Sequence, residues 1–206
     1  MLLYIVTDRS WLGENRLEDQ VEETIRAGAT FVQLREKELD EKAFLEEARF
    51  VKAVTDRYGV PFVINDSLSV ALACQADGVH VGQSDAGCRE ARALLGPDKI
   101  VGVSVQTVEQ ALKAQADGAD YLGVGAVFGS TTKLDAADVS YDTLKAICAA
   151  VEIPVVAIGG INPQNIRELA GSGVDGVAVI SAVFAQPDIY RAAKTLCDLS
   201  KEMVAQ

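Results

Sequence analysis

Amide and cationic side chains follow an apolar, β-branched segment early in the sequence. The strand expected at 30–34 leads into Gln33-Leu34-Arg35-Glu36-Lys37. Because side chains alternate along an extended chain, Gln33, Arg35 and Lys37 point the same way. An exposed, charged strand end is the simpler interpretation, but a sheet covered by helices has no exposed outer side. One amide and two cations on a shared face favour a site for an anion.

Two aspartates follow the next two segments of this kind. Asn65-Asp66 ends one segment, and Gly82-Gln83-Ser84-Asp85 ends the next. Mg²⁺ prefers oxygen ligands and is commonly held by one or two carboxylates together with substrate phosphates. Asp and Asn also favour turns and helix N-caps, so loop capping is the alternative for each residue taken alone. We predict that Asp66 and Asp85 together bind Mg²⁺.

Hydroxyl and amide groups end the fifth and sixth segments. Ser104 and Gln106 close the fifth, where either could instead cap a helix beginning near Thr107. The longer loop 125–133 has two glycines, three hydroxyls and a lysine, and is typical of a lid that grips a phosphate. Its polar residues are Ser130, Thr131, Thr132 and Lys133.

Small residues end the last two segments. Gly159-Gly160 follows the seventh, and Ser181 with Ala182 ends the eighth. In many parallel barrels, the loops after strands seven and eight bind a phosphate through backbone N–H groups, which requires small residues for close approach. These loops would form a second anion subsite, so two phosphorylated substrates would fit.

Eight such segments alternate with amphipathic helical patterns along the chain. In those patterns apolar residues recur three or four positions apart, as in Leu17, Val21 and Ile25. Motifs such as Ala76-Asp77-Gly78 and Ala116-Asp117-Gly118 recur before a strand, where glycine is expected to end the helix in a left-handed conformation. The candidate strands are 2–7, 30–34, 61–65, 78–82, 100–105, 121–127, 154–159 and 176–181.

This alternation over 206 residues predicts an α/β fold, a (β/α)₈ TIM barrel in which residues 1–206 form a single domain. A barrel brings the carboxyl ends of its strands to one face, so the polar residues described above would share one site. The alternative is a doubly wound sheet, which would need a glycine-rich dinucleotide loop after the first strand. Residues 7–11, Thr-Asp-Arg-Ser-Trp, are unlike such a loop.

Composition excludes several other classes of protein. A net charge of −11 argues against general affinity for nucleic acid or anionic membranes. No apolar stretch approaches the ~20 residues of a transmembrane helix. The first eight residues lack the basic region of a signal peptide, so we expect a cytoplasmic protein. Four cysteines at long, irregular spacings indicate buried, reduced thiols.

Taken together, these motifs resemble those of the thiamine phosphate synthase family. The matching pieces occur in order along nearly the whole chain. They are Tyr4-Ile5-Val6-Thr7-Asp8, Gln33-Leu34-Arg35-Glu36-Lys37, Asn65-Asp66, Asp77-Gly78-Val79-His80-Val81-Gly82-Gln83 with Asp85, Gly102-Val103-Ser104, Ser130-Thr131-Thr132-Lys133 and Ala157-Ile158-Gly159-Gly160-Ile161.

The resemblance implies a transferase that couples 4-amino-2-methyl-5-hydroxymethylpyrimidine diphosphate to 4-methyl-5-(2-phosphooxyethyl)thiazole, releasing pyrophosphate and thiamine phosphate. It implies Mg²⁺ as cofactor, and relatives suggest a homodimer. The implied catalytic residues are Arg35, Ser104 and Lys133, and the implied Mg²⁺ ligands are Asp66 and Asp85. The pyrimidine diphosphate would contact Gln33, Leu34, Arg35, Glu36, Lys37, Asn65, Ser104 and Lys133. The thiazole phosphate would contact Ser130, Thr131, Thr132, Gly160, Ile180 and Ser181.

Two other functions remain open. A related group of barrels isomerises the thiazole and, by resemblance, uses a histidine near the end of strand six, where this chain has Ala126. The second alternative function is that of a non-catalytic barrel, which binds a thiamine precursor and regulates another process. The only histidine, His80, stands between Val79 and Val81. We expect it to be a satisfied or helix-facing strand residue, away from the polar rim and dispensable for coupling.

Overall fold

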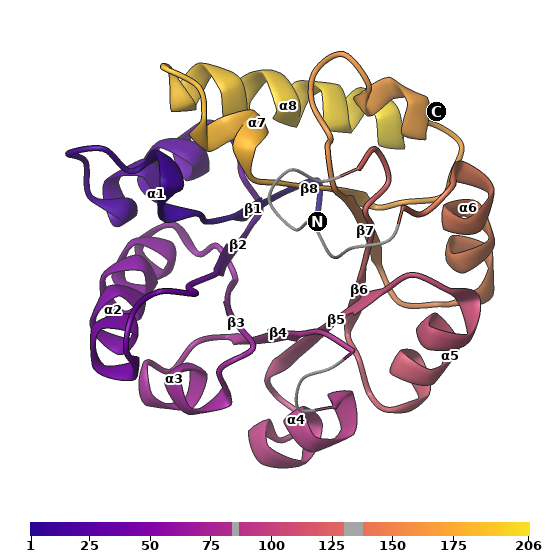
Figure 1. The fold of residues 1–206 in the computed structure, drawn as a ribbon. Coiled ribbons are helices and arrows are strands. Elements are labelled where there is room, and N and C mark those ends of the chain that lie inside the picture. Colours follow the sequence, from indigo (N-terminus) through magenta and orange to yellow (C-terminus); the bar gives the residue numbers. More distant parts are fainter. Residues whose placement is uncertain (84–86, 130–137) are drawn as a thin grey trace.

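The computed structural model describes residues 1–83, 87–129 and 138–206, and its eight parallel strands form a closed barrel (Figure 1). Each strand pairs with its neighbours in the sequence, and the last pairs with the first. The strands are β1 (Leu3–Val6), β2 (Phe31–Leu34), β3 (Phe62–Asn65), β4 (Gly78–Val81), β5 (Ile100–Val105), β6 (Tyr121–Val124), β7 (Val155–Ile158) and β8 (Gly176–Val179). The predicted TIM barrel is confirmed.

Helices surround the strands on the outside of the barrel (Figure 1). The α-helices are α1 (Leu17–Arg26), α2 (Glu41–Tyr58), α3 (Leu68–Ala73), α4 (Cys88–Leu95), α5 (Val108–Ala116), α6 (Tyr141–Ala150), α7 (Ser181–Phe184) and α8 (Ile189–Val204). Two 3-10 helices are η1 (Arg9–Trp11) and η2 (Ile166–Leu169). Within the described ranges, no helix combines the length and apolar character needed to cross a membrane.

The ends of the predicted strands differ from the observed ends most at β6. We expected that strand to continue to Val127, but it ends at Val124, where its pairing with β7 also ends. The chain turns at Gly125, where a Cβ atom would lie 2.1 Å from the carbonyl oxygen of Ile158. Ser181, expected at the end of a strand, instead begins α7. These shorter strands leave longer loops at the carboxyl face.

Alternation along the strands divides the core into two layers. Outward side chains such as Leu3 and Val79 pack in the large cluster between the barrel and its helices. The inner layer consists of Tyr4, Val6, Phe31, Val63, Tyr121, Val156 and Ala178. Its rings meet edge to face, with the centroids of Tyr4 and Phe31 4.7 Å apart and those of Phe31 and Tyr121 5.4 Å apart. The barrel interior is therefore filled, and ligands must bind at its ends.

The repeated aspartates secure the amino ends of the strands. Asp77 accepts a hydrogen bond from the N–H of Phe62 at 2.8 Å, and Asp120 accepts one from Val101 at 2.7 Å. The predicted left-handed glycine is found at Gly118 (φ 96°). The prediction is wrong at Gly78, where Gln75 (φ 57°) turns the chain instead. Gly78 is a glycine because a Cβ would lie 1.9 Å from the carbonyl oxygen of Ile100.

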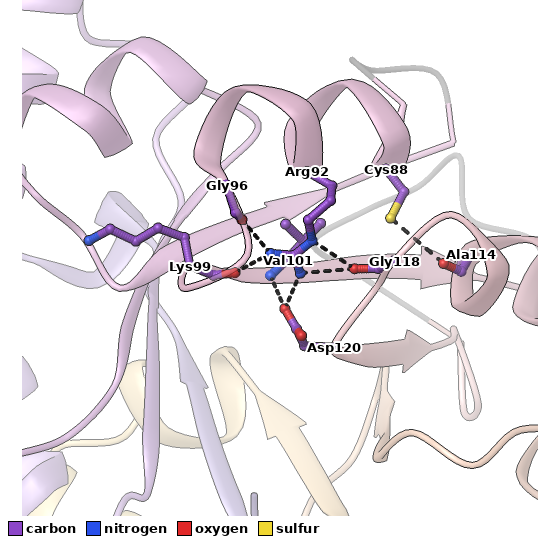
Figure 2. Close-up of polar contacts among 8 residues, drawn as sticks. All are labelled: Cys88, Arg92, Gly96, Lys99, Val101, Ala114, Gly118 and Asp120. Carbon is purple, nitrogen blue, oxygen red and sulfur yellow. Dashed lines mark hydrogen bonds and ion pairs between the residues drawn. The ribbon is translucent and has the colours of Figure 1, made fainter.

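Arg92 joins α4 to the start of β5 and the turn before β6 (Figure 2). Its guanidinium donates to the carbonyl oxygens of Gly96 at 2.8 Å, Lys99 at 2.6 Å and Gly118 at 2.9 Å, and it also pairs with Asp120. One half-buried cation thus satisfies acceptors that the ends of two helices leave open.

The four cysteines are free thiols, as predicted, and three of them are buried. Burial raises the pKa of Cys74 and Cys88, and it raises the pKa of the half-buried Cys148 to about 11. These thiols are therefore protonated at neutral pH, which argues for a packing role and against a nucleophilic one.

Candidate active site

The predicted polar residues of β2, β3 and β5 meet at the carboxyl end of the barrel. Gln33 lies on the inner side of β2 and is almost fully buried, while Asn65 and Ser104 are half-buried near the ends of β3 and β5. The outward positions between them, such as Leu34 and Val103, belong to the outer core. Alternation therefore directs the polar side chains inward, to a common mouth.

Arg35 follows directly after the carboxyl end of β2. Its backbone N–H donates to the hydroxyl of Thr7 at 3.1 Å, and that threonine is fully buried. The structure describes no residue that pairs with the half-buried guanidinium. A cation held at the mouth without a protein counter-ion is suited to an anionic ligand.

Lys37 and Asp66 come together at the rim, although they follow different strands. The Lys37 ammonium lies 3.1 Å from Oδ2 of Asp66, and the Asn65 amide donates to the same oxygen. Ser67, and not Asp66, caps α3 by accepting from the N–H of Val70 at 3.3 Å. Asp66 has a left-handed backbone (φ 64°), and its N–H donates to the carbonyl of His80 at 2.9 Å. Its carboxylate is therefore fixed at the rim without a capping role.

Two residues of the predicted diphosphate site point elsewhere. The Leu34 side chain is fully buried in the outer core. The carboxylate of Glu36 lies 3.7 Å from Nε of Arg9 and accepts the N–H of Lys37 at 2.9 Å. The Leu34 side chain is therefore turned away from the mouth, while the Glu36 carboxylate is engaged by Arg9, which follows β1. Glu36 instead shapes the loop that presents Lys37.

The predicted placement of His80 was wrong. Val79 and Val81 face the helices, so alternation turns His80 into the barrel. There its Nε2 lies 2.8 Å from the hydroxyl of Ser104, and its Nδ1 lies 2.8 Å from that of Tyr121. His80 is satisfied, as expected, but it contacts the polar rim through Ser104. We expected His80 to be dispensable for coupling because we placed it away from the polar rim, and that placement does not hold.

Ser104 is not used as a helix cap, because Thr107 caps α5 by accepting from the N–H of Gln110 at 3.2 Å. Gln106 donates to the carbonyl of Gly125 at 3.3 Å and so connects the loops after β5 and β6. The capping alternative therefore fails for Ser104, whose hydroxyl lies at the mouth beside His80.

The predicted second subsite lies on adjacent strands, β7 and β8. Gly160 has φ 65°, and a Cβ there would lie 2.5 Å from the carbonyl of Phe128, so only glycine fits. Ile180 and Ser181 are half-buried at the start of α7. Within the described ranges, the N–H groups of Gly160 and Ser181 donate to no acceptor. The remaining predicted site residues, Asp85, Ser130, Thr131, Thr132 and Lys133, lie outside the described residues.

Sequence reasoning missed Tyr4 and Tyr121, which connect the site to the barrel interior. Their hydroxyls lie 2.8 Å apart, and Gln33 donates to that of Tyr4. Burial raises the pKa of both phenols far above neutrality, so both remain protonated. The sequence feature that could have identified these two tyrosines is their alternation with outward-facing apolar residues, which marks them as inward-facing positions.

The family model and the relatives of high sequence identity point to one family. A family model described as thiamine monophosphate synthase matches residues 3–183. The chain is 48% identical over 200 residues to the thiamine-phosphate synthase of Clostridium tetani, covering 97% of this chain and 96% of that protein. It is 50% identical over 189 residues to the thiamine-phosphate synthase of Clostridioides difficile, covering 92% and 90%. The solved thiamine phosphate pyrophosphorylase from Pyrococcus furiosus superposes with a TM-score of 0.90 at 39% identity, covering 98% and 96%.

Proposed function

The chain belongs to the thiamine monophosphate synthase family and is a transferase of that class, and we propose that the mouth of its barrel performs the transfer. In this proposal, 4-amino-2-methyl-5-hydroxymethylpyrimidine diphosphate is coupled to 4-methyl-5-(2-phosphooxyethyl)thiazole. The products are thiamine phosphate and pyrophosphate. Residues 1–206 act as one domain.

One observation supports the placement of the diphosphate: Arg35, the Lys37–Asp66 pair and the Ser104 hydroxyl all lie at the carboxyl ends of β2, β3 and β5, on one end of the barrel. Breaking the bond between the pyrimidine methylene carbon and the diphosphate oxygen leaves a pyrimidine-stabilised carbocation, and the electron pair departs with pyrophosphate. The thiazole nitrogen then forms the new C–N bond. Arg35 and Lys133 would offset the charge on the departing group.

The residues at the rim fit Mg²⁺. The carboxylate of Asp66 is about a third exposed, and the structure describes no donor to its Oδ1. A carboxylate oxygen is a ligand that Mg²⁺ accepts together with phosphate oxygens. Asp66 would hold the ion with Asp85 as its expected partner. When bound, Mg²⁺ neutralises negative charge on the diphosphate.

The thiazole phosphate would bind on the other side of the mouth. The N–H groups of Gly160 and Ser181 are open to an acceptor, and the chain approaches closely enough there to require glycine. Ile180 and the hydroxyls of Ser130, Thr131 and Thr132 complete the proposed subsite. Two subsites hold the reacting atoms at attack distance, which converts a bimolecular step into one within a complex.

We extend the proposal to the cellular setting. The enzyme acts on phosphorylated small molecules in the cytoplasm, as a homodimer, without binding nucleic acid or membranes. Its net charge of −11 supports the last point. The thiazole isomerase function is not favoured, because Ala126 stands where that group has its histidine.

Release of pyrophosphate from the two named substrates tests the function. We expect one pyrophosphate per thiamine phosphate, and no release when either the thiazole phosphate or Mg²⁺ is omitted. Lys133→Ala should lower kcat/KM by about 100-fold or more, the size of one lost electrostatic contact to a transition state. Absence of pyrophosphate release from the folded protein with both substrates present would overturn the proposal.

A further inference from the structure

Five polar side chains from five strands form one hydrogen-bonded chain inside the barrel. Nε2 of Gln33 donates to the Tyr4 hydroxyl, which lies 2.8 Å from the Tyr121 hydroxyl. That hydroxyl lies 2.8 Å from Nδ1 of His80, and Nε2 of His80 lies 2.8 Å from the Ser104 hydroxyl. The first four residues are buried, and only Ser104 is open to the mouth.

The amide at the buried end sets the direction of this chain. Tyr4 accepts from Gln33, so its own proton is available to Tyr121. Tyr121 then donates to Nδ1 of His80, which must be the unprotonated ring nitrogen, and Nε2 carries the proton. In the opposite direction, Tyr121 would donate to Tyr4 and leave the Tyr4 proton without an acceptor among the described residues. Buried donors without acceptors are disfavoured.

Steric constraints keep the ring in place. A Cβ atom at Gly123 of β6 would lie 3.2 Å from Cε1 of His80, so β6, two strands away from β4, leaves room for the imidazole and little else. The ring centroids of His80 and Tyr121 are 5.4 Å apart, with a tilt of 38°. Because burial keeps both phenols protonated, the chain retains its donors at neutral pH.

We propose that His80 is a positioning residue whose Nε2–H donates to Ser104, so that the Ser104 hydroxyl donates its own proton to an acceptor on the pyrimidine diphosphate. The contact between Ser104 and the diphosphate rests on the proposed function, but the direction of the hydrogen bonds from Gln33 to Ser104 does not. His80 transfers no proton in this scheme. It fixes a dipole that would otherwise rotate, which is a form of preorganisation.

The tautomer can be measured directly, because the chain has a single histidine. In ¹⁵N-edited NMR of the free protein, we expect a pyrrole-type Nε2 and a pyridine-type Nδ1. Tyr121→Phe removes the donor to Nδ1, so the two nitrogens should become more alike. Phe31→Leu removes a ring that packs against Tyr4 and Tyr121 but removes no hydrogen bond of the chain, so it should leave the tautomer unchanged. A protonated Nδ1 in the wild-type protein would overturn the proposal, whether or not the enzyme couples the named substrates.

Kinetics then separate positioning from a structural role. His80→Leu should lower kcat/KM by about tenfold, the size of one net hydrogen bond. His80→Gln retains an N–H donor and should recover part of that loss. In a Ser104→Ala background, neither substitution should have a further effect, since the hydroxyl to be positioned is gone. If the loss in kcat/KM from a His80 substitution instead multiplies that from Ser104→Ala in the double variants, and circular dichroism shows that these variants are folded, His80 acts only on structure. That result would refute the positioning role.

Discussion

At the residue scale, the site depends on charges that the protein leaves available to a ligand. Arg35 is anchored through its backbone to Thr7, while its guanidinium has no partner in the described part of the chain. Asp66 shares one oxygen with Lys37 and Asn65, and no residue that the structure describes donates to the other. These groups contribute little to folding. Substituting them should therefore change activity and leave stability nearly unchanged.

Arg35→Met should lower kcat/KM by about 100- to 1000-fold, because it removes a cation from the departing diphosphate. The melting temperature should stay the same, since no described ion pair is lost. Steady-state kinetics and thermal unfolding together check this. Arg89→Met, which removes an exposed cation paired with Asp117, serves as the control and should leave kcat/KM unchanged.

Asp66→Asn should raise the Mg²⁺ concentration needed for half-maximal activity, because an amide is a weaker ligand than a carboxylate. Asparagine tolerates the left-handed backbone at this position (φ 64°), so the fold should be retained. Titration of activity with Mg²⁺ measures the effect, with Asp56→Asn on α2 as a matched control. An unaltered Mg²⁺ requirement would exclude Asp66 as a ligand.

At the element scale, helices and turns hold the site loops from behind. The loop after β2 is held by Arg9, which pairs with Glu36 and with Glu47 of α2. This fixes the segment between Arg35 and Lys37 without using groups that face the mouth. At the amino ends of β5 and β6, away from the site loops, Arg92 of α4 ties two turns together (Figure 2). Each helix thus secures the loop of a neighbouring strand.

Burial raises the pKa of Glu47, and the adjacent Glu36 carboxyl adds to the shift. The folded protein therefore holds this proton more tightly than the unfolded chain does. Its stabilising contribution is complete below the ordinary carboxyl pKa of ~4.3 and is lost as the pH rises through the folded value. Glu47→Gln lacks this contribution, so the free energy of unfolding of the wild type minus that of the variant should decrease with rising pH. Urea denaturation at several pH values checks this, and the exposed Glu46→Gln should show no such trend.

Arg92→Met should destabilise the protein by about 1–3 kcal/mol, because the carbonyls of Gly96, Lys99 and Gly118 lose their shared donor. Chemical denaturation measures the change. Arg89→Met on the same helix loses only an exposed ion pair and should cost less than about 1 kcal/mol. Equal effects of the two substitutions would contradict the role given to Arg92.

At the scale of the whole molecule, closure of the barrel connects the site to its core. The ring of strands forces every second side chain inward, so aromatic rings fill the centre while polar groups remain at the carboxyl end. The hydrogen-bonded chain from Gln33 to Ser104 crosses this interior. Packing inside the barrel and the orientation of a site hydroxyl are therefore linked.

Gly102→Ala tests that link. A Cβ at this position would lie 2.1 Å from the Tyr121 ring, so the ring must move. We expect a loss of about 1–3 kcal/mol in stability from overpacking, together with reduced activity as Tyr121 shifts away from His80. Gly87→Ala meets no atom within 4 Å and should be nearly neutral in both measurements.

The barrel could be predicted from the sequence because its signals are local. Each strand and each helix must bury its own apolar face, so the apolar pattern of each element can be recognised within a short stretch of sequence. Arg35, Asn65 and Ser104 were expected on one face because each was assigned to the end of a predicted strand, and the carboxyl ends of parallel strands lie on the same face of a barrel. The ion pair between Lys37 and Asp66 was not predicted, because it depends on how the loops after β2 and β3 approach each other.

The roles of Glu36, His80, Tyr4 and Tyr121 were decided only by the tertiary structure. The family resemblance implied Glu36 as a ligand contact, and its place within a strand favoured His80 as a bystander, but the partners of both come from distant segments. Glu36 pairs with Arg9, and His80 is joined to Ser104 across neighbouring strands. A hydrogen bond depends on distances of a few tenths of an ångström between groups far apart in the chain. Sequence periodicity determines which face a side chain takes, and only the closed barrel determines what it meets there.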